Sequence, residues 1–321
     1  MTPAEPYDLD EDASRLDFIG DVHGCAQTLE RLLEQMGYRH QQGVYAHAQR
    51  KAVFVGDILD RGPRIREALA LVREMVERGS AYLILGNHEI NALCYCTVHP
   101  SAPGNYLRPH TPRNTRIISE TLEQFAHHND EWRDHLQWLA RRPLYLRARG
   151  ANIVHACWDS TVIEARTSAV LDESEWLALA DPSSMSAQHV KRLTSGIELP
   201  LPEGRFMLSA EGYKRRSFRA KFWEQAPQTL GDLAFQPDPL PAEIAALAIK
   251  PEIDRQLVVY DSRQPPLFLG HYWLSGVPQP VAPNIACLDY SAVKFGRLVA
   301  YRGDGAQRIH PDNYAWVYVD P

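Results

Sequence analysis

Three short apolar runs near the start of the chain predict buried β-strands. They are LDFIG at 16–20, AVFVG at 52–56 and AYLILG at 81–86, and none carries charge beyond its first residues. Such runs are typical of strands that are covered on both faces of a parallel sheet. Apolar residues recur at three- and four-residue intervals after the first two runs, in QTLERLLEQM and IREALALVREMV, which predicts amphipathic helices. Strand, loop and helix follow one another twice, which predicts βαβ units.

Later segments predict packing helices and more strands. Residues 118–143 (ISETLEQFAHHNDEWRDHLQWLARRP) repeat apolar positions at helical intervals. Residues 144–155 (LYLRARGANIVH) predict a hairpin that turns at Arg-Gly. From RQLVVYD at 255–261 to NYAWVYVD at 313–320, β-rich runs are separated by Pro, Gly and Asn, which predicts a second sheet. The fold class predicted is α/β, with the two sheets forming a sandwich.

The distribution of apolar runs and polar motifs predicts a terminal segment and one domain that contains an insertion. Residues 1–15 are acidic and are predicted to form a flexible N-terminus, whereas 16–321 are predicted to form a single domain. Within that domain, residues from about 161 to 253 lack strand-end motifs and contain helical pieces such as SEWLALA. We expect a helical insertion there that lies over the active crevice as a lid or specificity element, since long functional segments commonly do so.

Composition narrows the class of protein. Apolar residues make up 45% of the 321 residues and charged residues 23%, which is ordinary for a soluble globular protein. No apolar run approaches the roughly 18 residues that cross a bilayer. The net charge of −6 argues against a sequence-independent nucleic-acid binder. Five irregularly spaced cysteines and an acidic start without a signal-peptide pattern predict a cytoplasmic location.

Polar motifs follow the three apolar runs directly. They are GDVHG at 20–24, GDILDRGP at 56–63 and GNHE at 86–89. Open α/β sheets bind ligands beyond the carboxyl ends of their strands, so the three motifs should meet in one crevice. Their carboxylate, imidazole and amide groups suit divalent cations such as Mn, Fe, Zn or Mg. Asp57 is the best candidate to bridge two cations. The alternative is that each Gly-Asp merely forms a turn.

Two histidines also follow apolar runs. His155 ends ANIVH and His271 ends LFLGH, so each is a candidate ligand or, alternatively, a histidine of the core. In contrast, His127, His128 and His135 lie among charged residues, and we assign them to a solvated helix face.

The insertion contains the densest basic run of the chain, interleaved with aromatic residues. Three interpretations are open: a solvated face with aromatic residues packed below it, a nucleic-acid surface, or an arginine clamp on a substrate phosphate. Arg216 and Arg219 are the candidates for the clamp. The basic residues are Lys214, Arg215, Arg216, Arg219 and Lys221.

Together the three motifs resemble the calcineurin-like metallophosphoesterases. The Asp-Arg-Gly of GDILDRGP resembles the phosphoprotein phosphatase branch, which includes serine/threonine phosphatases and bacterial dinucleoside tetraphosphatases. The resemblance implies a two-sheet sandwich of the metallophosphoesterase type and two divalent cations, with manganese as first choice and Fe, Zn or Mg as alternatives. It implies that water between the cations is the nucleophile. The implied ligands are Asp21, His23, Asp57, Asn87, His155 and His271.

The resemblance also implies roles for the residues around the cations. His88 should protonate the leaving oxygen, Asp60 should orient His88, and Arg61 should bind the phosphoryl oxygens, with Asn87 and one arginine of the insertion beside it. Glu89 should fix the loop. Two positions depart from related patterns: Ala156 replaces the glycine of a His-Gly pair, and Trp273 stands where many nucleases and diesterases have a second histidine.

The predicted function is therefore that of a metal-dependent phosphatase. Its substrate is left open between phosphomonoesters, phosphoproteins and dinucleoside polyphosphates. One alternative is a pyrophosphohydrolase that resembles bacterial bis(5'-nucleosyl)-tetraphosphatase. Another is a non-catalytic scaffold of the same fold, although every expected site position is filled.

Overall fold

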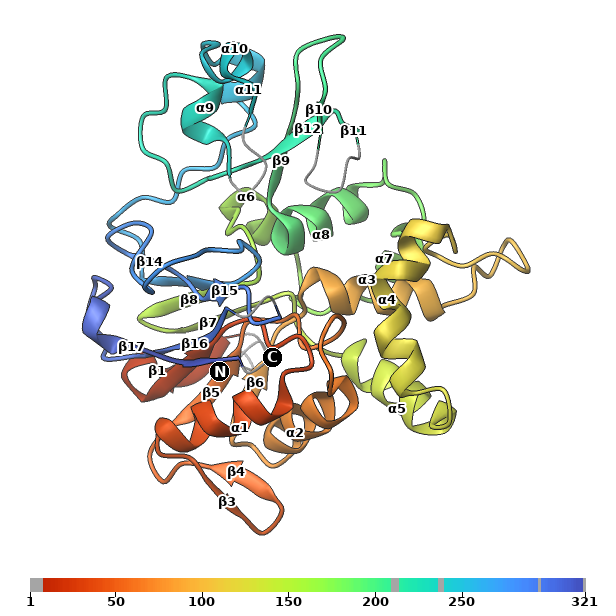
Figure 1. The fold of residues 1–321 in the computed structure, drawn as a ribbon, viewed down its shortest axis with the longest axis vertical. Coiled ribbons are helices and arrows are strands. Elements are labelled where there is room, and N and C mark those ends of the chain that lie inside the picture. Colours follow the sequence, from red (N-terminus) through yellow and green to blue (C-terminus); the bar gives the residue numbers. More distant parts are fainter. Residues whose placement is uncertain (1–7, 209–213, 236–239, 294–295, 320–321) are drawn as a thin grey trace.

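Two β-sheets face each other and form the centre of the molecule (Figure 1). The computed structural model describes residues 8–208, 214–235, 240–293 and 296–319. The sheets are joined through their apolar inner faces: the rings of Phe18 and Phe268, one from each sheet, stack with their centroids 3.6 Å apart. The predicted two-sheet α/β fold is confirmed.

The first sheet contains the three parallel strands expected from the apolar runs. Its order is β15-β16-β2-β5-β6, and β17 pairs with β16. β2, β5 and β6 are parallel, and β16 is antiparallel to β2. The bounds are β2 (Leu16–Ile19), β5 (Lys51–Phe54), β6 (Ala81–Leu83), β15 (Asp289–Tyr290), β16 (Arg297–Arg302) and β17 (Tyr314–Tyr318).

The second sheet has the order β1-β7-β8-β13-β14. β7 and β8 form the predicted antiparallel hairpin, and Gly150 turns it with a φ of 86°. β13 runs parallel to both β8 and β14. The bounds are β1 (Asp8–Asp12), β7 (Tyr145–Arg149), β8 (Ala151–Val154), β13 (Leu267–Leu269) and β14 (Ile285–Cys287).

Three expectations about strands are corrected. The C-terminal strands do not all enter the second sheet, because β16 pairs with β2 and brings β15 and β17 into the first. The run 255–261 forms no strand, and Val259 within it is exposed, so the apolar residues that suggested a buried strand are not all buried. Residues 8–12, expected to be flexible, form the edge strand β1, where Glu11 forms an ion pair with Lys51 at 2.7 Å. Charged side chains suit an edge strand. Residues 1–7 lie outside the described residues.

Helices cover the outer face of the first sheet and one side of the molecule (Figure 1). α1 and α2 match the predicted helices, and their apolar stripes are buried. The helical stretch expected over 118–143 forms the end of one helix and a second helix that starts at 129, where Asp130 and Glu131 favour a helix N-terminus. His135, assigned above to a solvated face, is instead buried. The bounds are α1 (Ala26–Gln35), α2 (Ile65–Glu77), α3 (Asn87–Cys96), α4 (Pro112–Gln124) and α5 (Asn129–Leu139). A small hairpin consists of β3 (Arg39–Gln41) and β4 (Val44–Ala46), and short 3-10 turns lie at Ala13–Arg15 and Pro311–Asn313.

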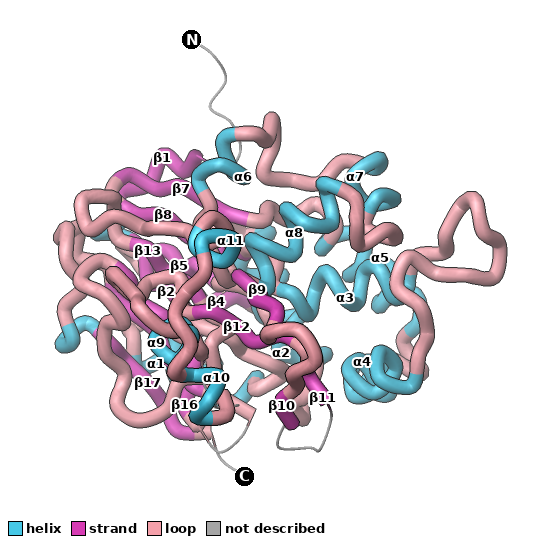
Figure 2. The backbone as a smooth tube through the Cα atoms, turned by 90° about the horizontal axis from the view of Figure 1, so that it is seen from above, coloured by secondary structure: helices cyan, strands magenta, loops and turns pink. Residues whose placement is uncertain are grey.

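The insertion packs above the second sheet and contains strands as well as helices. In Figure 2, α11, β9 and β12 lie in front of the two sheets, and α3, α4, α5 and α8 lie to one side. The insertion expected to be helical thus also contains short strands, since β9 pairs with β12 and β10 with β11. The elements are α6 (Ser160–Glu164), α7 (Glu173–Ala178), α8 (Met185–Ser195), β9 (Ile197–Pro200), β10 (Met207–Leu208), β11 (Lys214–Arg215), β12 (Ser217–Ala220), α9 (Leu230–Leu233), α10 (Ala242–Ala245) and α11 (Pro251–Asp254). Within the described residues, no helix has the length and apolar character to cross a membrane.

Candidate active site

Asp57 lies between two groups of potential metal ligands at the carboxyl ends of the strands. His23, Asp57 and His88 form one group, and Asp57, His155 and His271 form the other; the ligand atoms of each group lie within 4.8 Å of one another. The Asp57 Oδ2 atom lies 3.7 Å from His23 Nε2 and 3.4 Å from His155 Nε2. All five side chains are buried. A carboxylate shared by two such groups suits a bridge between two cations.

The remaining predicted ligands contact these groups. Asn87 Oδ1 lies 3.3 Å from His155 Nε2. The Asp21 carboxylate accepts a hydrogen bond from the backbone N–H of His271 at 3.1 Å. The structure therefore brings all six predicted ligand residues into one cluster, while their role in binding metal stays a prediction.

Three of the histidines are oriented by backbone carbonyls. A ring N–H that donates to a carbonyl leaves the lone pair on the other ring nitrogen, and this fixes which nitrogen can bind a cation. Ala156, which replaces the expected glycine, does not have a positive φ and leaves the preceding imidazole of His155 in place. The contacts are His23 Nδ1 to Leu59 O at 2.8 Å, His155 Nδ1 to Val55 O at 2.7 Å and His271 Nε2 to Ser195 O at 3.1 Å.

His88 is held in a different way, by a carboxylate. Its Nδ1 lies 2.6 Å from Asp60 Oδ2, and its Nε2 lies 3.0 Å from Arg61 Nη2. Asp60 is completely buried, and its other oxygen accepts a hydrogen bond from the Thr121 hydroxyl at 2.5 Å. The carboxylate occupies Nδ1 and fixes the orientation of the ring, so that Nε2 is the nitrogen that faces Arg61. Thr121 was not singled out in the sequence, because nothing in its helical context distinguishes it.

Glu89 fixes the loops that carry these residues. Its buried carboxylate accepts four backbone hydrogen bonds, which tie the second motif to the third. Burial and the nearby Asp57 raise the pKa of Glu89. The role expected for Glu89 in fixing the loop agrees with this network. The donors are Asp57 N at 2.8 Å, Ile58 N at 2.8 Å, Leu59 N at 3.2 Å and Gly86 N at 2.9 Å.

The backbone of the cluster adopts conformations that are uncommon for residues with side chains. Positive φ angles at such residues concentrate at functional sites, where the surrounding structure must hold them. A glycine is required beside them, because a Cβ at Gly86 would lie 2.2 Å from Asp57 Oδ1. The angles are 42° at His23, 52° at Asp57, 66° at Asp60, 69° at Arg61 and 67° at His271.

Burial and neighbouring charges shift the pKa values of the cluster. Burial lowers the pKa values of His23 and His271 well below the usual range. Burial would also lower the pKa of His155, but Asp57 and Asp21 outweigh it and raise this pKa to about 10. For Asp57, the histidines outweigh burial and hold its pKa well below the usual range. Burial, followed by the charge of Asp289, raises the pKa of Asp21 well above its usual range.

Asp289 is a site residue that the sequence interpretation missed. Its carboxylate is 2% exposed, and its Oδ2 has no hydrogen-bond partner among the described residues. Its position gives a signal that could have found it: it follows the apolar run of β14 just as Asp21 follows that of β2. Buried, uncompensated carboxylates are costly unless a positive charge neutralises them. The cluster therefore fits divalent cations both in its donor atoms and in its excess of negative charge.

The two arginine candidates of the insertion differ in position. The Arg219 Nη1 donates a hydrogen bond to His271 O at 3.3 Å, whereas Arg216 is exposed and its backbone carbonyl accepts from Leu201 N. Burial lowers the pKa of Arg219 from its usual value. Arg219 is therefore the better candidate for contact with a phosphate.

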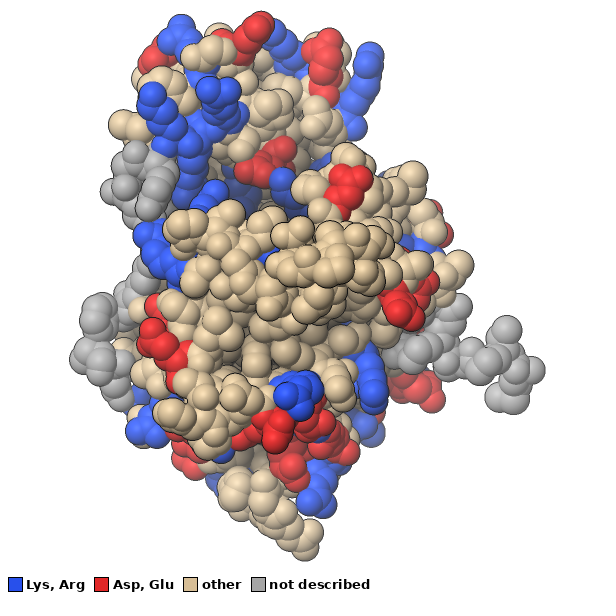
Figure 3. Space-filling model, turned by 90° about the vertical axis from the view of Figure 1, so that its right-hand side faces the viewer, with Lys and Arg blue, Asp and Glu red and all other residues tan. Residues whose placement is uncertain are grey.

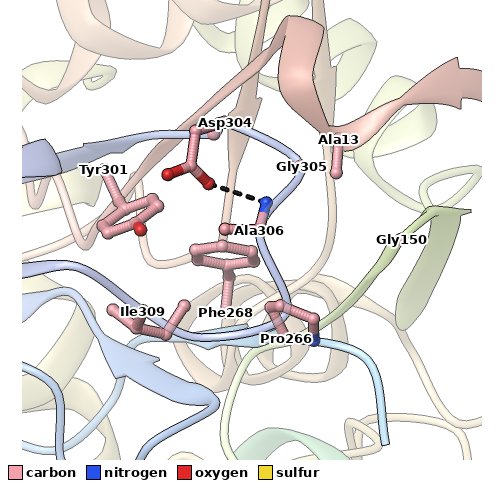
Figure 4. Close-up of a pocket in the computed structure, with 10 residues that line it drawn as sticks. Ala13, Gly150, Pro266, Phe268, Tyr301, Asp304, Gly305, Ala306 and Ile309 are labelled. Carbon is pink, nitrogen blue, oxygen red and sulfur yellow. Dashed lines mark hydrogen bonds between the residues drawn. The ribbon is translucent and has the colours of Figure 1, made fainter.

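The small pocket in Figure 4 is separate from this cluster. Phe268, Tyr301 and the loop around Asp304 line it, and Ala306 N donates to Asp304 Oδ1 at 2.9 Å. Its other lining residues include Pro266 and Gly150, which precede β13 and β8. The pocket thus lies at the amino ends of strands whose carboxyl ends carry His271 and His155.

Comparison with known proteins agrees with the geometry. The family model of the calcineurin-like phosphoesterases matches residues 14–181, more than half of the chain. The chain belongs to the calcineurin-like phosphoesterase family. The matched residues include the three motifs and His155, while His271 and Arg219 lie beyond them.

Relatives of this phosphoesterase include two asymmetrical bis(5'-nucleosyl)-tetraphosphatases named PrpE. That of Oceanobacillus iheyensis is 34% identical over 143 residues, which are 44% of this chain and 55% of the relative. That of Halalkalibacterium halodurans is 45% identical over 75 residues, 23% of this chain and 30% of the relative. The chain thus spans about half or less of the length of these relatives. A solved serine/threonine phosphatase of Saccharomyces cerevisiae has a TM-score of 0.49 at 13% identity, covering 97% of this chain and 80% of that one.

Proposed function

We propose that this phosphoesterase hydrolyses phosphate esters with two divalent cations, of which manganese is the first choice. The residues that would hold the cations are Asp21, His23, Asp57, Asn87, His155 and His271. When bound, the cations would supply an acidified water as the nucleophile. No covalent intermediate with a protein side chain is needed.

The chain itself performs binding, orientation and proton transfer. Arg61 and Arg219 bind the phosphoryl oxygens, since guanidinium groups match them with paired N–H donors. Asn87, at the cluster's edge, also faces the substrate. When the Arg61 guanidinium turns from His88 Nε2 to the phosphoryl group, this nitrogen faces the leaving oxygen. His88 then takes up a proton from solvent at the freed Nε2 and donates it to that oxygen, while Asp60 keeps the imidazole oriented and supports its positive charge.

One observation carries this proposal. Among the four histidines of the cluster, His23, His155 and His271 each contact a backbone carbonyl, whereas His88 contacts the Asp60 carboxylate at 2.6 Å. The first arrangement suits a neutral ligand, and the second suits a protonated acid. A non-catalytic scaffold would not require this distinction.

A substrate panel tests the proposal. Metal-free protein is supplied in turn with Mn, Fe, Zn and Mg, and hydrolysis of p-nitrophenyl phosphate, a phosphopeptide and diadenosine tetraphosphate is measured. We expect metal-dependent turnover that is lost in His88→Asn and kept in His128→Asn, because His128 directly precedes α5 and is not part of the cluster. Absence of turnover on all three substrates with all four metals would contradict the proposal.

A second candidate is cleavage of dinucleoside tetraphosphates, which the names of the PrpE relatives favour. The panel separates it from the first: asymmetrical cleavage of diadenosine tetraphosphate gives ATP and AMP, which chromatography distinguishes from two ADP. A nucleotide, a phosphorylated small molecule and a phosphoprotein remain the proposed substrate classes. We also retain the cytoplasm as the proposed location, since all five cysteines are free thiols.

A further inference from the structure

Trp273 lies against two guanidinium groups at the edge of the catalytic cluster. The Cζ atom of Arg61 lies 5.1 Å from the centroid of the indole, and that of Arg219 lies 5.9 Å from it. Both distances are within the roughly 6 Å over which a cation is attracted to an aromatic face. One indole thus contacts arginines that are far apart in the chain.

Both guanidinium groups also contact the catalytic cluster directly. Arg61 Nη1 lies 3.3 Å from His23 Nε2, in addition to the contact of its Nη2 with His88. Arg219 Nη1 donates to the carbonyl of His271 at 3.3 Å, and the ring of Tyr272 lies 5.8 Å from its Cζ. The two guanidinium groups therefore both border the catalytic cluster.

Acidic neighbours act on this pair only at longer range, the buried Asp289 on both arginines and Glu198 on Arg219. Within the part of the chain that the structure describes, no carboxylate forms an ion pair with Arg61 or Arg219. An aromatic ring attracts a cation through its quadrupole without cancelling its charge, whereas a carboxylate would compete with a phosphate for the same N–H donors. In Figure 3, Lys and Arg side chains likewise gather on one side of the upper part of the molecule, where the insertion lies.

The pair is also open to a ligand. Arg61 is exposed, and Trp273 and Arg219 are half-buried. A terminal phosphoryl group carries two negative charges and three free oxygens, whereas a diester carries one charge and two free oxygens. Two guanidinium groups beside one cluster match the first better than the second.

We propose that Trp273 is a positioning residue that holds Arg61 and Arg219 as a pair, and that the pair selects a dianionic terminal phosphoryl group over a diester. This inference rests on the proposed function. Trp273 itself transfers no proton and binds no metal ion. Its effect on the substrate acts through the two arginines.

The test compares Trp273→Ala and Trp273→Phe in the full, manganese-loaded chain. In Trp273→Ala, we expect KM for p-nitrophenyl phosphate and the inhibition constant of inorganic phosphate to rise together by roughly 3- to 30-fold, the span of one or two cation–π contacts. Hydrolysis of bis(p-nitrophenyl) phosphate should change less, and kcat and metal content should stay close to wild type. Trp273→Phe should recover most of the loss, because it keeps an aromatic face.

Tyr318→Ala is the matched control. It removes a ring that lies 4.8 Å from the Arg297 Cζ, a cation–aromatic contact that includes neither Arg61 nor Arg219. It should leave phosphate inhibition unchanged. A double-mutant cycle of Trp273→Ala with Arg219→Ala should be non-additive, since both changes act on the same contact.

An unchanged inhibition constant in Trp273→Ala, equal losses in the Ala and Phe variants, or equal losses on monoester and diester would each overturn the inference. If the wild-type protein hydrolysed no ester, the proposed function would fail. Calorimetric titration of the manganese-loaded protein with inorganic phosphate would then still test whether Trp273 controls anion binding.

Discussion

Replacing Asp60 by Asn tests the proton-transfer role of His88 while it changes hardly any volume. In the native site, His88 Nδ1–H donates to the Asp60 carboxylate at 2.6 Å, and Asp60 accepts from Thr121 at 2.5 Å. An amide keeps its oxygen on the Thr121 hydroxyl and turns its NH₂ toward His88. The Nδ1 atom must then become an acceptor, which moves the ring proton to Nε2 and places it against the Arg61 N–H at 3.0 Å.

The expected loss follows from this contact. A hydrogen bond to a charged group contributes about 1.5–3 kcal/mol. The hydrogen bond between His88 and Asp60 reaches its full strength only when His88 is protonated. The variant should therefore lose roughly 10- to 150-fold in rate, at about tenfold for each 1.36 kcal/mol. The loss should grow as the leaving group becomes poorer, since a poor leaving group depends more on the proton that His88 supplies.

The assay is kcat over a series of aryl phosphates of increasing leaving-group pKa, at constant manganese content. Glu131→Gln is the matched control. Glu131 Oε1 lies 3.7 Å from His135 Nε2 on α5, so the two residues are a carboxylate–histidine pair outside the cluster. The control should match wild type at every leaving group. Asp60→Asn with wild-type rates, or with a loss that is equal for all leaving groups, would refute the proposed role of the pair.

Three further results are expected. His88→Asn should keep both metals and lose roughly 10²–10⁴ in rate for a poor leaving group; steady-state kinetics that match wild type would remove His88 from the mechanism. Asp57→Asn should weaken both metals at once, because its Oδ2 lies between the two groups; two full equivalents by elemental analysis would argue against a bridge. Metal binding at pH 7 should release protons, since the pKa of His155 is raised to about 10 and a ligand must be neutral. Metal affinity should therefore increase with pH up to that value, and equal calorimetric enthalpies in buffers of different ionisation enthalpy would contradict this.

Much of the cluster could be predicted because one physical rule places it. Asp21, Asp57, His155 and His271 each follow an apolar run, and the carboxyl ends of parallel strands meet at one edge. The same rule applied to the apolar run of β14 would have found Asp289. The residues around Asp289 were overlooked because they do not resemble a known family motif. The parallel strands and the first two helices were predicted for the same reason: their periodicity is strong and local.

What could not be predicted depends on contacts between distant segments. Nothing local in 297–302 shows that β16 joins β2 rather than the second sheet. Thr121 supports Asp60 from 61 residues away along the chain. Arg216 and Arg219 look alike in sequence, and only the path of β12 turns Arg219 toward His271. Trp273 could be noticed only as a departure from a histidine, since its two arginine neighbours come from the second motif and from the insertion.

Anomalous diffraction from crystals of the full chain soaked in manganese would show directly whether the cluster holds two cations. We expect two anomalous peaks, with the Asp57 carboxylate in contact with both, Asp21 and His23 on one, and Asn87, His155 and His271 on the other. A structure without manganese at these residues, or with a single ion that does not touch Asp57, would contradict a site of two cations that share the Asp57 carboxylate.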